Sequence, residues 1–233
     1  MQIVILCGGK ATRLYPLSKK IPKSMIKIER KPFLEHQLDL LKKNKIKNIL
    51  LCVGYKGEQI KDYFGDGKKF GVDIKYSQEK KKLLGTAGAL KNAEKLLEDK
   101  FLMIWGDSYL PFDFQKAIKF FNKFNKLGLM TVYKNCNRYE PSNVEVEGNL
   151  VKVYSKKRKT KKMKYIDYGV SIFRKEVLKY IPKNQVYDIS RLNQLLIKKK
   201  QLLAFPVRKR FYQIGTFSGI EEFREYIKKE RKN

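Results

Sequence analysis

The stretch that decides the fold is QIVILCGGKATRLYPL at residues 2–17, which is followed shortly by Pro22-Lys23. The apolar run at 2–7 predicts a buried strand. Gly8 and Gly9 directly after it let the backbone bend and approach a phosphate with N–H groups pointing inward. Arg13 and Lys23 then supply fixed cations for a polyphosphate. Gly-Gly alone favours a plainer interpretation, a tight turn with two solvated cations, so the remaining motifs have to decide.

The spacing of this loop excludes two common nucleotide-binding designs. It is neither GxxxxGK[ST], which marks P-loop NTPases, nor the GxGxxG of NAD-linked dehydrogenases. In open α/β sheets a ligand binds beyond the carboxyl ends of the strands. We therefore expect an anion site at the end of the first strand, built by a different loop.

Outward from this loop, short apolar runs alternate with amphipathic stretches over the first half of the chain. This rhythm predicts a doubly wound, mixed but mostly parallel α/β sheet of Rossmann-like type. The expected strands are 2–7, 46–54, 72–77, 101–107 and 127–134, and the expected helices are 33–44, 57–65, 86–97 and 114–124.

The second half changes character and predicts a small antiparallel lobe. Residues 143–155 alternate inward and outward around Gly148-Asn149, as in a hairpin. We expect a strand at 163–175, a helix near 174–181, a helix at 188–200 capped by Asp188, strands at 202–207 and 210–215, and a helix at 218–230 capped by Ser218. The chain is expected to form one domain, residues 1–233, with an N-terminal half (1–135) that carries the glycine loop and a C-terminal half (136–233).

Composition sets broad limits. The 233 residues include 53 Lys plus Arg and 23 Asp plus Glu, a net charge of +30, and 42% are hydrophobic, which is enough for a sizeable core. An excess made mostly of Lys fits surface composition better than designed nucleic-acid recognition, which prefers Arg. Three cysteines without metal spacing, and the lack of a long apolar segment, predict a cytoplasmic protein without a membrane partner.

Several motifs in order resemble the sugar-1-phosphate nucleotidyltransferases, also called NDP-sugar pyrophosphorylases. The loop is similar to their GGxGTRLxPL signature and the following PK. Later segments also match: LGTAGAL at 84–90, WGD at 105–107, YSKK at 154–157 in place of FxEK, DYG at 167–169, and QIGT at 213–216 in place of DIGT. The resemblance covers essentially the whole chain and implies transfer of a nucleoside monophosphate from an NTP to a sugar 1-phosphate, with Mg²⁺ as cofactor.

The chemistry of this reaction explains the residue types. The nucleophile is the substrate's own phosphate, so catalysis needs alignment and charge neutralisation rather than a general base. The catalytic residues implied by the resemblance are Arg13, Lys23 and Asp107, with Asp107 and Gln213 at the metal. The nucleotide-binding residues are Leu6, Gly8, Gly9, Lys10, Thr12, Gln78, Glu79, Gly85, Thr86 and Gly88, and the sugar-phosphate-binding residues are Asn143, Lys157, Asp167 and Gly169. Taken singly, Gly85–Gly88 also fits a loop-to-helix entry, Asp107 a helix cap and Asn143 a turn.

Three positions depart from the family pattern. Ala11 replaces a signature glycine, and a methyl group there costs roughly 1–2 kcal/mol if the backbone is left-handed. Gln213 replaces the aspartate before IGT, and an amide oxygen can ligate Mg²⁺ but carries no charge. Lys156 replaces an acidic residue. Two interpretations follow: an active enzyme with modified metal ligation, or a degenerate relative that binds its ligands without turnover. The retained Arg13, Lys23 and Asp107 favour the active enzyme.

The substrates and a rival function stay open at the level of sequence. Our preferred substrates are GTP and a mannose- or heptose-type 1-phosphate, with cytidylyl, uridylyl or thymidylyl transfer as alternatives. The basic run KKRKTKKMK at 156–164, like the clusters at 80–82 and 198–200, raises the rival hypothesis of a non-catalytic nucleic-acid-binding protein. The run has no interleaved aromatic residues for base stacking, so no specific nucleic-acid partner is expected.

Overall fold

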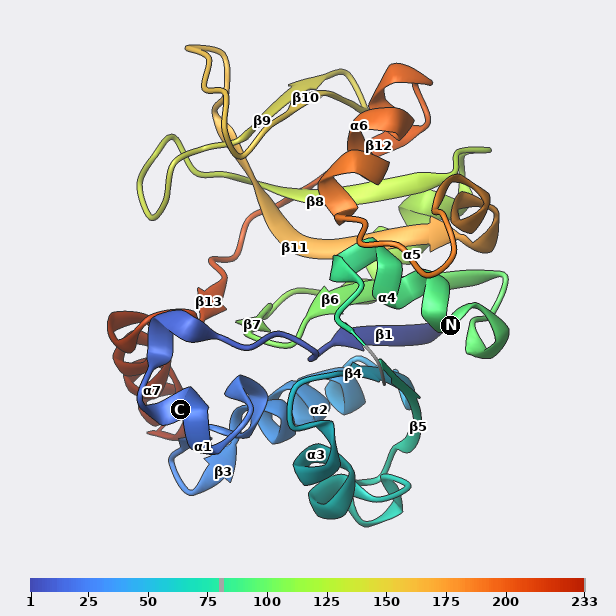
Figure 1. Cartoon of the computed structure of the whole chain (residues 1–233). Helices are drawn as coiled ribbons and strands as arrows, with labels where there is room; N and C mark the ends of the chain where they lie inside the picture. The colour runs from blue at the N-terminus through green and yellow to red at the C-terminus, as the bar shows by residue number, and fades with distance from the viewer. Residues whose placement is uncertain (80–81, 233) are drawn as a thin grey trace.

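The computed structural model describes residues 1–79 and 82–232, so Lys80 and Lys81 of the basic cluster at 80–82 lie outside the described residues. In this part of the chain one nine-stranded mixed sheet runs through the molecule (Figure 1), in the order β5-β4-β1-β6-β11-β8-β12-β10-β9. Its strands are β1 (Gln2–Leu6), β4 (Asn48–Val53), β5 (Asp73–Gln78), β6 (Lys100–Trp105), β8 (Gly128–Lys134), β9 (Val144–Glu147), β10 (Leu150–Tyr154), β11 (Tyr165–Arg174) and β12 (Leu202–Val207).

Parallel pairing dominates the half of the sheet that precedes residue 106. Strand β1 pairs in parallel with both β4 and β6, and β4 pairs in parallel with β5. Strand β11 then runs antiparallel between β6 and β8, while β8 and β12 are parallel again. The expected hairpin is confirmed, because β9 and β10 pair antiparallel around Gly148, whose φ is +57°. The antiparallel lobe therefore continues the central sheet instead of forming a separate one.

Helices cover both faces of the sheet, as expected for a doubly wound fold. Helices α2 (Phe33–Lys43), α3 (Gly57–Phe64) and α5 (Phe114–Asn122) pack one face through residues such as Leu38, Ile60 and Phe121. Helices α4 (Gly85–Asn92) and α6 (Ile189–Lys198) pack the other, together with the 3-10 helix η5 (Lys175–Tyr180). Each face buries alternate residues of the same strands, since successive side chains of a strand point to opposite sides.

A third apolar cluster attaches the C-terminal helix beside the glycine loop. Phe223 of α7 (Phe217–Lys232) meets Phe33 edge-on, with ring centroids 5.0 Å apart. The cluster also includes Leu14 of the 3-10 helix η1 (Thr12–Leu14) and Ile28 of β2 (Lys27–Ile28). Strand β2 pairs with β3 (Lys31–Pro32), and the same part of the chain forms α1 (Leu17–Lys20) and the 3-10 helix η2 (Lys23–Met25). A separate two-stranded ribbon pairs β7 (Ser108–Tyr109) with β13 (Tyr212–Gln213).

Four local expectations need correction. The helix near 174–181 is the 3-10 helix η5, and the helix expected at 86–97 ends at Asn92 before a 3-10 turn, η4 (Glu94–Leu96). The strand expected at 210–215 shrinks to β13. The last helix begins at Phe217, so its cap is Thr216, whose Oγ1 accepts a hydrogen bond from the N–H of Gly219, and not Ser218. No helix in the described ranges is long and apolar enough to cross a membrane.

Candidate active site

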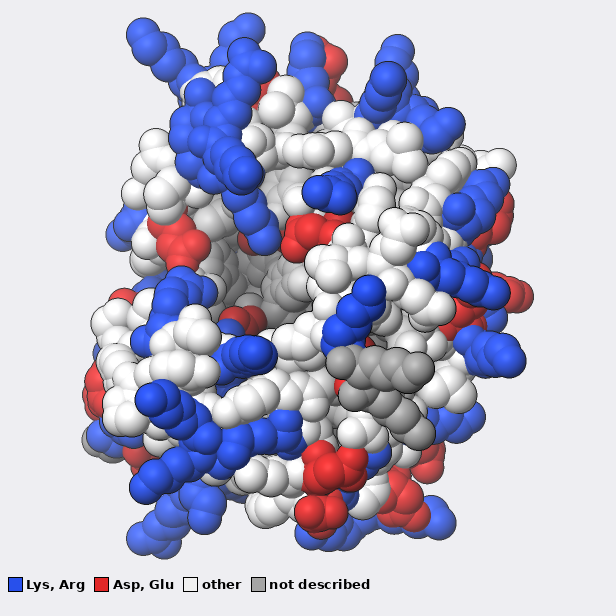
Figure 2. All heavy atoms as spheres, in the orientation of Figure 1, with Lys and Arg blue, Asp and Glu red and all other residues white. Residues whose placement is uncertain are grey.

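The carboxyl ends of β1, β5 and β6 meet around a cavity of about 280 Å³. Figure 2 shows a hollow at the centre of this face with Lys and Arg side chains around its rim. Strands leave their last residues at one edge of a parallel sheet, which brings together loops far apart in the sequence. The lining residues are Leu6, Cys7, Gly8, Gly9, Lys23, Ser24, Cys52, Glu79, Leu83, Gly85, Thr86, Ala89, Trp105, Gly106 and Asp107.

The glycine loop leaves β1 and is held in place by the neighbouring strand. The carbonyl oxygen of Gly8 accepts a hydrogen bond from the N–H of Tyr55, and a methyl group at position 8 would lie 2.9 Å from Oε2 of Glu79. At Gly9, by contrast, a methyl group would meet no atom within 4 Å. Gly8 is therefore required by the protein's own packing, whereas Gly9 faces open space in the cavity.

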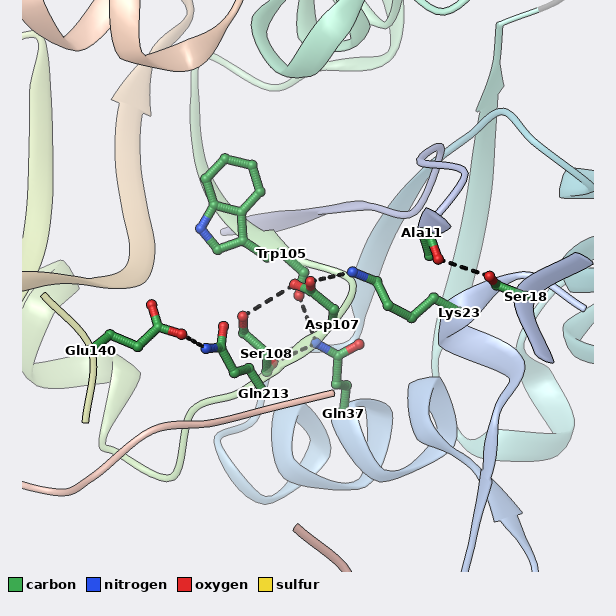
Figure 3. Close-up of polar contacts among 9 residues, drawn as sticks. All are labelled: Ala11, Ser18, Lys23, Gln37, Trp105, Asp107, Ser108, Glu140 and Gln213. Carbon is green, nitrogen blue, oxygen red and sulfur yellow. Dashed lines mark hydrogen bonds and ion pairs between the residues drawn. The ribbon is translucent and has the colours of Figure 1, made fainter. Parts of the chain in front are cut away.

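Ala11 occupies the left-handed region that favours glycine, with φ +52° and ψ +45°. A left-handed alanine costs roughly 1–2 kcal/mol. The replacement of the signature glycine by Ala11 therefore has this cost. The carbonyl of Ala11 accepts hydrogen bonds from Oγ of the buried Ser18, at 2.8 Å, and from the N–H of Leu14. These two bonds hold the strained residue in place, and Figure 3 shows the one from Ser18.

Gly9→Ala separates phosphate binding from folding. We expect thermal unfolding to stay unchanged, because φ at Gly9 lies outside the left-handed region and the methyl group meets no protein atom. Affinity for an NTP should fall at least about 10-fold, or about 1.4 kcal/mol, because the methyl group fills space beside the loop N–H groups. Trp105 is the single tryptophan and lines the cavity, so its fluorescence reports NTP binding. Unchanged affinity would contradict a phosphate site at this loop.

An ion pair crosses the mouth of the cavity. Nζ of Lys23 lies 2.5 Å from Oδ2 of Asp107, and both side chains keep about a quarter or less of their surface exposed. Lys23 begins η2 directly after Pro22, and Asp107 follows β6. Oδ1 of Asp107 accepts a hydrogen bond from Oγ of Ser108 at 3.3 Å. The pair holds a cation and a carboxylate side by side where phosphates can compete for the cation.

Arg13 approaches the site from the other side of the loop. It is exposed on η1, and its guanidinium lies 3.4 Å from where a methyl group at Gly215 would stand. Glycine at 215 thus leaves room for Arg13 against the segment after β13. Ile214 in that segment donates its backbone N–H to the carbonyl oxygen of Asp107 at 2.9 Å. The short segment at 214–215 therefore lies beside Arg13 and is hydrogen-bonded to Asp107.

The inner end of the cavity combines a carboxylate with apolar walls. Oε1 of Glu79 accepts the backbone N–H of Leu84 at 2.6 Å, and Oε2 faces Gly8 and Gly54. Burial raises the pKa of Glu79 above its usual value, and the N–H of Leu84 opposes that shift. Burial also raises the pKa of Cys7 to about 12, so this thiol stays protonated and is no nucleophile at neutral pH.

Gly85 and Thr86 join the two halves of the molecule. Gly85 has φ +74°, and a side chain there would press against the carbonyl of Tyr187 at 2.9 Å. Oγ1 of Thr86 accepts the backbone N–H of Ile189 at 2.7 Å and donates to Oδ2 of Asp188 at 3.2 Å. The start of α4 is thereby bound to the start of α6.

A second polar region opens beside Trp105, toward β11. Oδ1 of Asn143 accepts the N–H of Asp167 at 2.9 Å, and Oδ1 of Asp167 accepts the N–H of Gly169 at 3.0 Å. Gly169 has φ +104°, and a methyl group there would lie 3.1 Å from the Trp105 ring. Nζ of Lys156 lies 5.7 Å from the centre of that ring. Three of the four residues expected to bind the sugar phosphate are thus neighbours.

The carboxyl of Asp167 is the strongly perturbed acid of this region. Burial raises its pKa to about 6 from its usual value near 3.8, while the N–H of Gly169 and the charge of Lys156 oppose the shift. The folded protein therefore holds this proton more tightly than the unfolded chain. The stabilising effect is fully present below about pH 4 and is lost as the pH rises through about 6.

Asp167→Asn should raise the free energy of unfolding at pH 7 by up to roughly 3 kcal/mol, and this gain should shrink toward pH 4. The amide oxygen of asparagine can still accept the N–H of Gly169. Asp188→Asn is the matched control: burial opposes ionisation there, but hydrogen bonds from Ser190 outweigh it and lower the pKa. Its change should have the opposite sign. Denaturant unfolding of both variants across this pH range measures the difference, and parallel pH profiles would contradict it.

The structure brings about half of the expected site residues to the cavity itself. Leu6, Gly8, Gly9, Lys23, Glu79, Gly85, Thr86 and Asp107 line it. Lys10 and Thr12 are exposed on the loop, Gln78 is bonded to Lys61 and Glu58 of α3, and Gly88 packs against Leu84 and Gln185. Lys157 is exposed, with its N–H bonded to Oγ of Ser155, and its neighbour Lys156 reaches Trp105 instead.

Three residues of this region were not among the predicted site residues: Cys7 and Trp105, which line the cavity, and Glu140, which lies outside it. Trp105 directly precedes the Gly-Asp motif, and Cys7 lies inside the glycine loop, so both could have been read from their motifs. Glu140 could not: its carboxylate accepts a hydrogen bond from Nε2 of Gln213, 73 positions away. Figure 3 shows this contact next to Ser108 and Asp107.

A glycine loop at a strand end, a cation–carboxylate pair and a second polar pocket on the same sheet edge define a nucleotide-dependent transferase. The family described as nucleotidyl transferase matches residues 2–230. The chain belongs to this family and is a nucleotidyltransferase.

Two relatives of the chain are sugar-1-phosphate nucleotidyltransferases that differ in the base of their names. It is 36% identical over 218 residues to a D-glycero-alpha-D-manno-heptose 1-phosphate guanylyltransferase of Campylobacter jejuni, covering 92% of this chain and 95% of the relative. It is 32% identical over 205 residues to a UTP–glucose-1-phosphate uridylyltransferase of Synechocystis, covering 81% of this chain but only 53% of that enzyme. The crystal structure of HddC from Yersinia pseudotuberculosis complexed with GMP-PN has a TM-score of 0.79 and 26% identity, covering 97% of this chain and 99% of that one.

Proposed function

We propose that this protein transfers a guanylyl group from GTP to a mannose- or heptose-type sugar 1-phosphate and releases pyrophosphate. The similarity to the heptose 1-phosphate guanylyltransferase and to the GMP-PN complex supports the choice of base and sugar. The three cysteines are free, which fits the reducing cytoplasm as the place of this reaction.

The observation that carries the choice of guanine is the carboxylate of Glu79 at the inner end of the cavity. Guanine presents two neighbouring donors, N1–H and N2–H₂, on its Watson–Crick edge, and an ionised carboxylate accepts both. Uracil and thymine place a carbonyl on each side of their single N3–H, and those carbonyls repel a carboxylate. Oε2 of Glu79 faces Gly8 while Oε1 accepts the N–H of Leu84, so the side chain is held toward the cavity.

The reaction needs alignment and charge neutralisation. An oxygen of the sugar phosphate forms a bond to the α-phosphorus of GTP, and the bond from that phosphorus to the β-phosphate oxygen breaks, so pyrophosphate leaves with the electron pair. The nucleophile is already ionised near pH 7, and no proton has to be removed. In our proposal the backbone of Gly8–Lys10 holds the β- and γ-phosphates. Arg13 neutralises the leaving pyrophosphate, and Lys23 moves from Asp107 to the phosphates in reaction.

The residues at the end of β6 fit a magnesium ion. Mg²⁺ takes oxygen ligands and is usually held by one or two carboxylates, with substrate phosphates and water completing the shell. Asp107 offers a half-buried carboxylate, and Gln213 lies beside it because β13 pairs with β7. In the described residues no group of three His, Cys, Asp or Glu forms a closed metal site. When bound, the ion neutralises phosphate charge, and Asp107 and Gln213 would hold it.

A matrix of the four common NTPs against several sugar 1-phosphates, with pyrophosphate as the readout, tests the proposal. GTP should exceed UTP and dTTP by at least about 10-fold in kcat/KM, as one bidentate contact is worth about 1–3 kcal/mol. Glu79→Gln should lower kcat/KM for GTP about 10-fold or more and narrow this preference, because glutamine presents an N–H₂ where guanine also has a donor. Glu58→Gln on exposed α3 is the matched control. A preference for another NTP in the wild type would overturn the choice of guanine.

The basic run at 156–164 is the feature on which the rival hypothesis, a non-catalytic nucleic-acid-binding protein, depends. It forms the loop between β10 and β11 that projects from the sheet in Figure 1, and Lys159 and Thr160 are bonded to Ser142 and Glu145. A solvated loop of lysines binds nucleic acid only through counterion release, so such binding should vanish at physiological salt. Selective nucleic-acid binding at that salt, with no pyrophosphate from any NTP, would overturn the proposed function.

A further inference from the structure

The neutral residue at the metal site has an acidic partner from a distant loop. Gln213 pairs with Ser108 across the β13–β7 ribbon, and the neighbouring Ile214 donates its N–H to the carbonyl of Asp107 at 2.9 Å. These bonds fix the backbone of Gln213 beside Asp107. On the other side of Gln213 lies Glu140, whose Oε1 accepts the hydrogen bond from Gln213 Nε2 (Figure 3).

The loop that carries Glu140 is itself held firmly. Asn135, which is 2% exposed, donates from Nδ2 to the carbonyl of Glu140 at 2.5 Å and to Oγ of Ser142 at 3.1 Å. Oδ1 of Asn135 accepts the N–H of Tyr139 at 3.1 Å. Arg210 stacks on the ring of Tyr139, with its guanidinium carbon 4.1 Å from the ring centre. A buried asparagine therefore sets the position from which Glu140 reaches Gln213.

The contact fixes which end of the amide faces the metal site. An ionised carboxylate has acceptors only, so the N–H₂ end of Gln213 must face Glu140. The oxygen of the same amide is then left for a ligand, and oxygen is the atom that Mg²⁺ binds. A carboxylate hydrogen-bonded to the N–H₂ group also draws positive charge to that end and leaves the amide oxygen more negative.

We propose that Glu140 is a positioning residue for the metal site: it orients Gln213 so that the amide oxygen is a metal ligand beside Asp107, and it supplies the negative charge that Gln213 lacks. The inference rests on the proposed function, because it assumes that Asp107 holds the metal. It assigns a role to a residue outside every motif of the glycine loop and the strand ends. Arg210, which stacks on Tyr139 of this loop, is paired with Glu222.

The test measures Mn²⁺ affinity by EPR, with and without a non-hydrolysable GTP analogue, alongside thermal unfolding. Glu140→Gln keeps an acceptor but removes the charge, and Glu140→Ala removes both. We expect the Kd for Mn²⁺ to rise about 10-fold in Glu140→Gln and more in Glu140→Ala, within the range known for residues that orient metal ligands. Glu147→Gln removes a carboxylate that is paired with Lys152 on the β9–β10 hairpin, and it should leave the Kd unchanged.

A second background separates orientation from direct ligation. Gln213→Asp supplies its own carboxylate, so adding Glu140→Gln to it should not weaken Mn²⁺ binding, and the double variant should bind at least as tightly as the wild type. If Glu140→Gln weakens Mn²⁺ binding in both the wild type and Gln213→Asp, or in neither, the inference is overturned while the metal site itself stands. Wild-type affinity no better than that of Asp107→Asn would overturn the metal site itself, and this inference with it.

Discussion

Lys23→Ala is expected to lower kcat/KM by roughly 10³-fold with little effect on folding. Among the residues that the structure describes, Lys23 is the lysine that lines the cavity, and its Nζ lies 2.5 Å from Oδ2 of Asp107. In the transition state charge builds up on the phosphate oxygens, and removing one fixed donor from such a site costs about 2.7–4 kcal/mol. Because this charge is greater in the transition state than in bound NTP, kcat should fall more than the affinity for NTP.

Two further measurements make this result specific. Lys19 is exposed on α1, and Lys19→Ala should keep wild-type turnover. It is the control for the loss of a positive charge on the nearby surface. Loss of Lys23 also frees the Asp107 carboxylate, so Mn²⁺ should bind more tightly to Lys23→Ala than to the wild type. A variant with turnover within a few-fold of the wild type would contradict the role of Lys23. Weaker Mn²⁺ binding would instead show that Lys23 holds the Asp107 carboxylate in position for the metal.

The parts of the fold that depend on local pattern could be predicted from sequence. Buried runs and helical periodicity placed the parallel strands β1, β4, β5 and β6, and Gly148-Asn149 placed the β9–β10 hairpin. The insertion of β11 between β6 and β8 could not be predicted, because pairing partners so distant in sequence leave no periodicity. The cap at the start of the final helix was placed two residues too late because Thr216 and Ser218 have nearly the same capping ability.

The candidate site divides in the same way. Gly8, Gly9 and Asp107 meet because each lies just after a strand that ends at one sheet edge, and Lys23 of η2 joins them through its ion pair with Asp107. Lys156 and Lys157 are adjacent and chemically alike, so only the path of their loop decides which one reaches Trp105. The Glu140–Gln213 contact joins two loops with no shared motif. Such contacts depend on tertiary structure, and sequence reasoning could at most notice that a charge was missing at 213.

The left-handed Ala11 shows how a departure from a motif is tolerated. The conformation has a real cost, yet the carbonyl of Ala11 is fixed by Ser18 and Leu14. Since the loop keeps the shape that glycine would adopt, the departure affects stability more than it affects the position of the phosphate-facing N–H groups. Retention of Lys23, Arg13 and Asp107 around this loop is consistent with an active enzyme.

Asp107→Asn is expected to lower kcat by roughly 10²–10³-fold, with part of the loss recovered at high Mn²⁺ or Mg²⁺. The reason is the loss of the charged ligand, since an amide oxygen binds a divalent ion more weakly than a carboxylate. Folding should be little affected, because the backbone carbonyl of residue 107 still accepts the N–H of Ile214, and Ser108 can still donate to the amide oxygen. Asp73→Asn, exposed on β5, is the matched control.

Metal dependence distinguishes this variant from Lys23→Ala, although the two residues form one ion pair. Activity of Asp107→Asn should rise with metal concentration to a level well above its value at the wild-type optimum, because mass action offsets a weakened site. Activity of Lys23→Ala should saturate at lower metal concentration than that of the wild type and gain nothing beyond it. If Asp107 served only to hold Lys23 in place, Asp107→Asn would show an unchanged metal requirement. Equal metal profiles in the wild type and Asp107→Asn would therefore reduce Asp107 to a partner of Lys23.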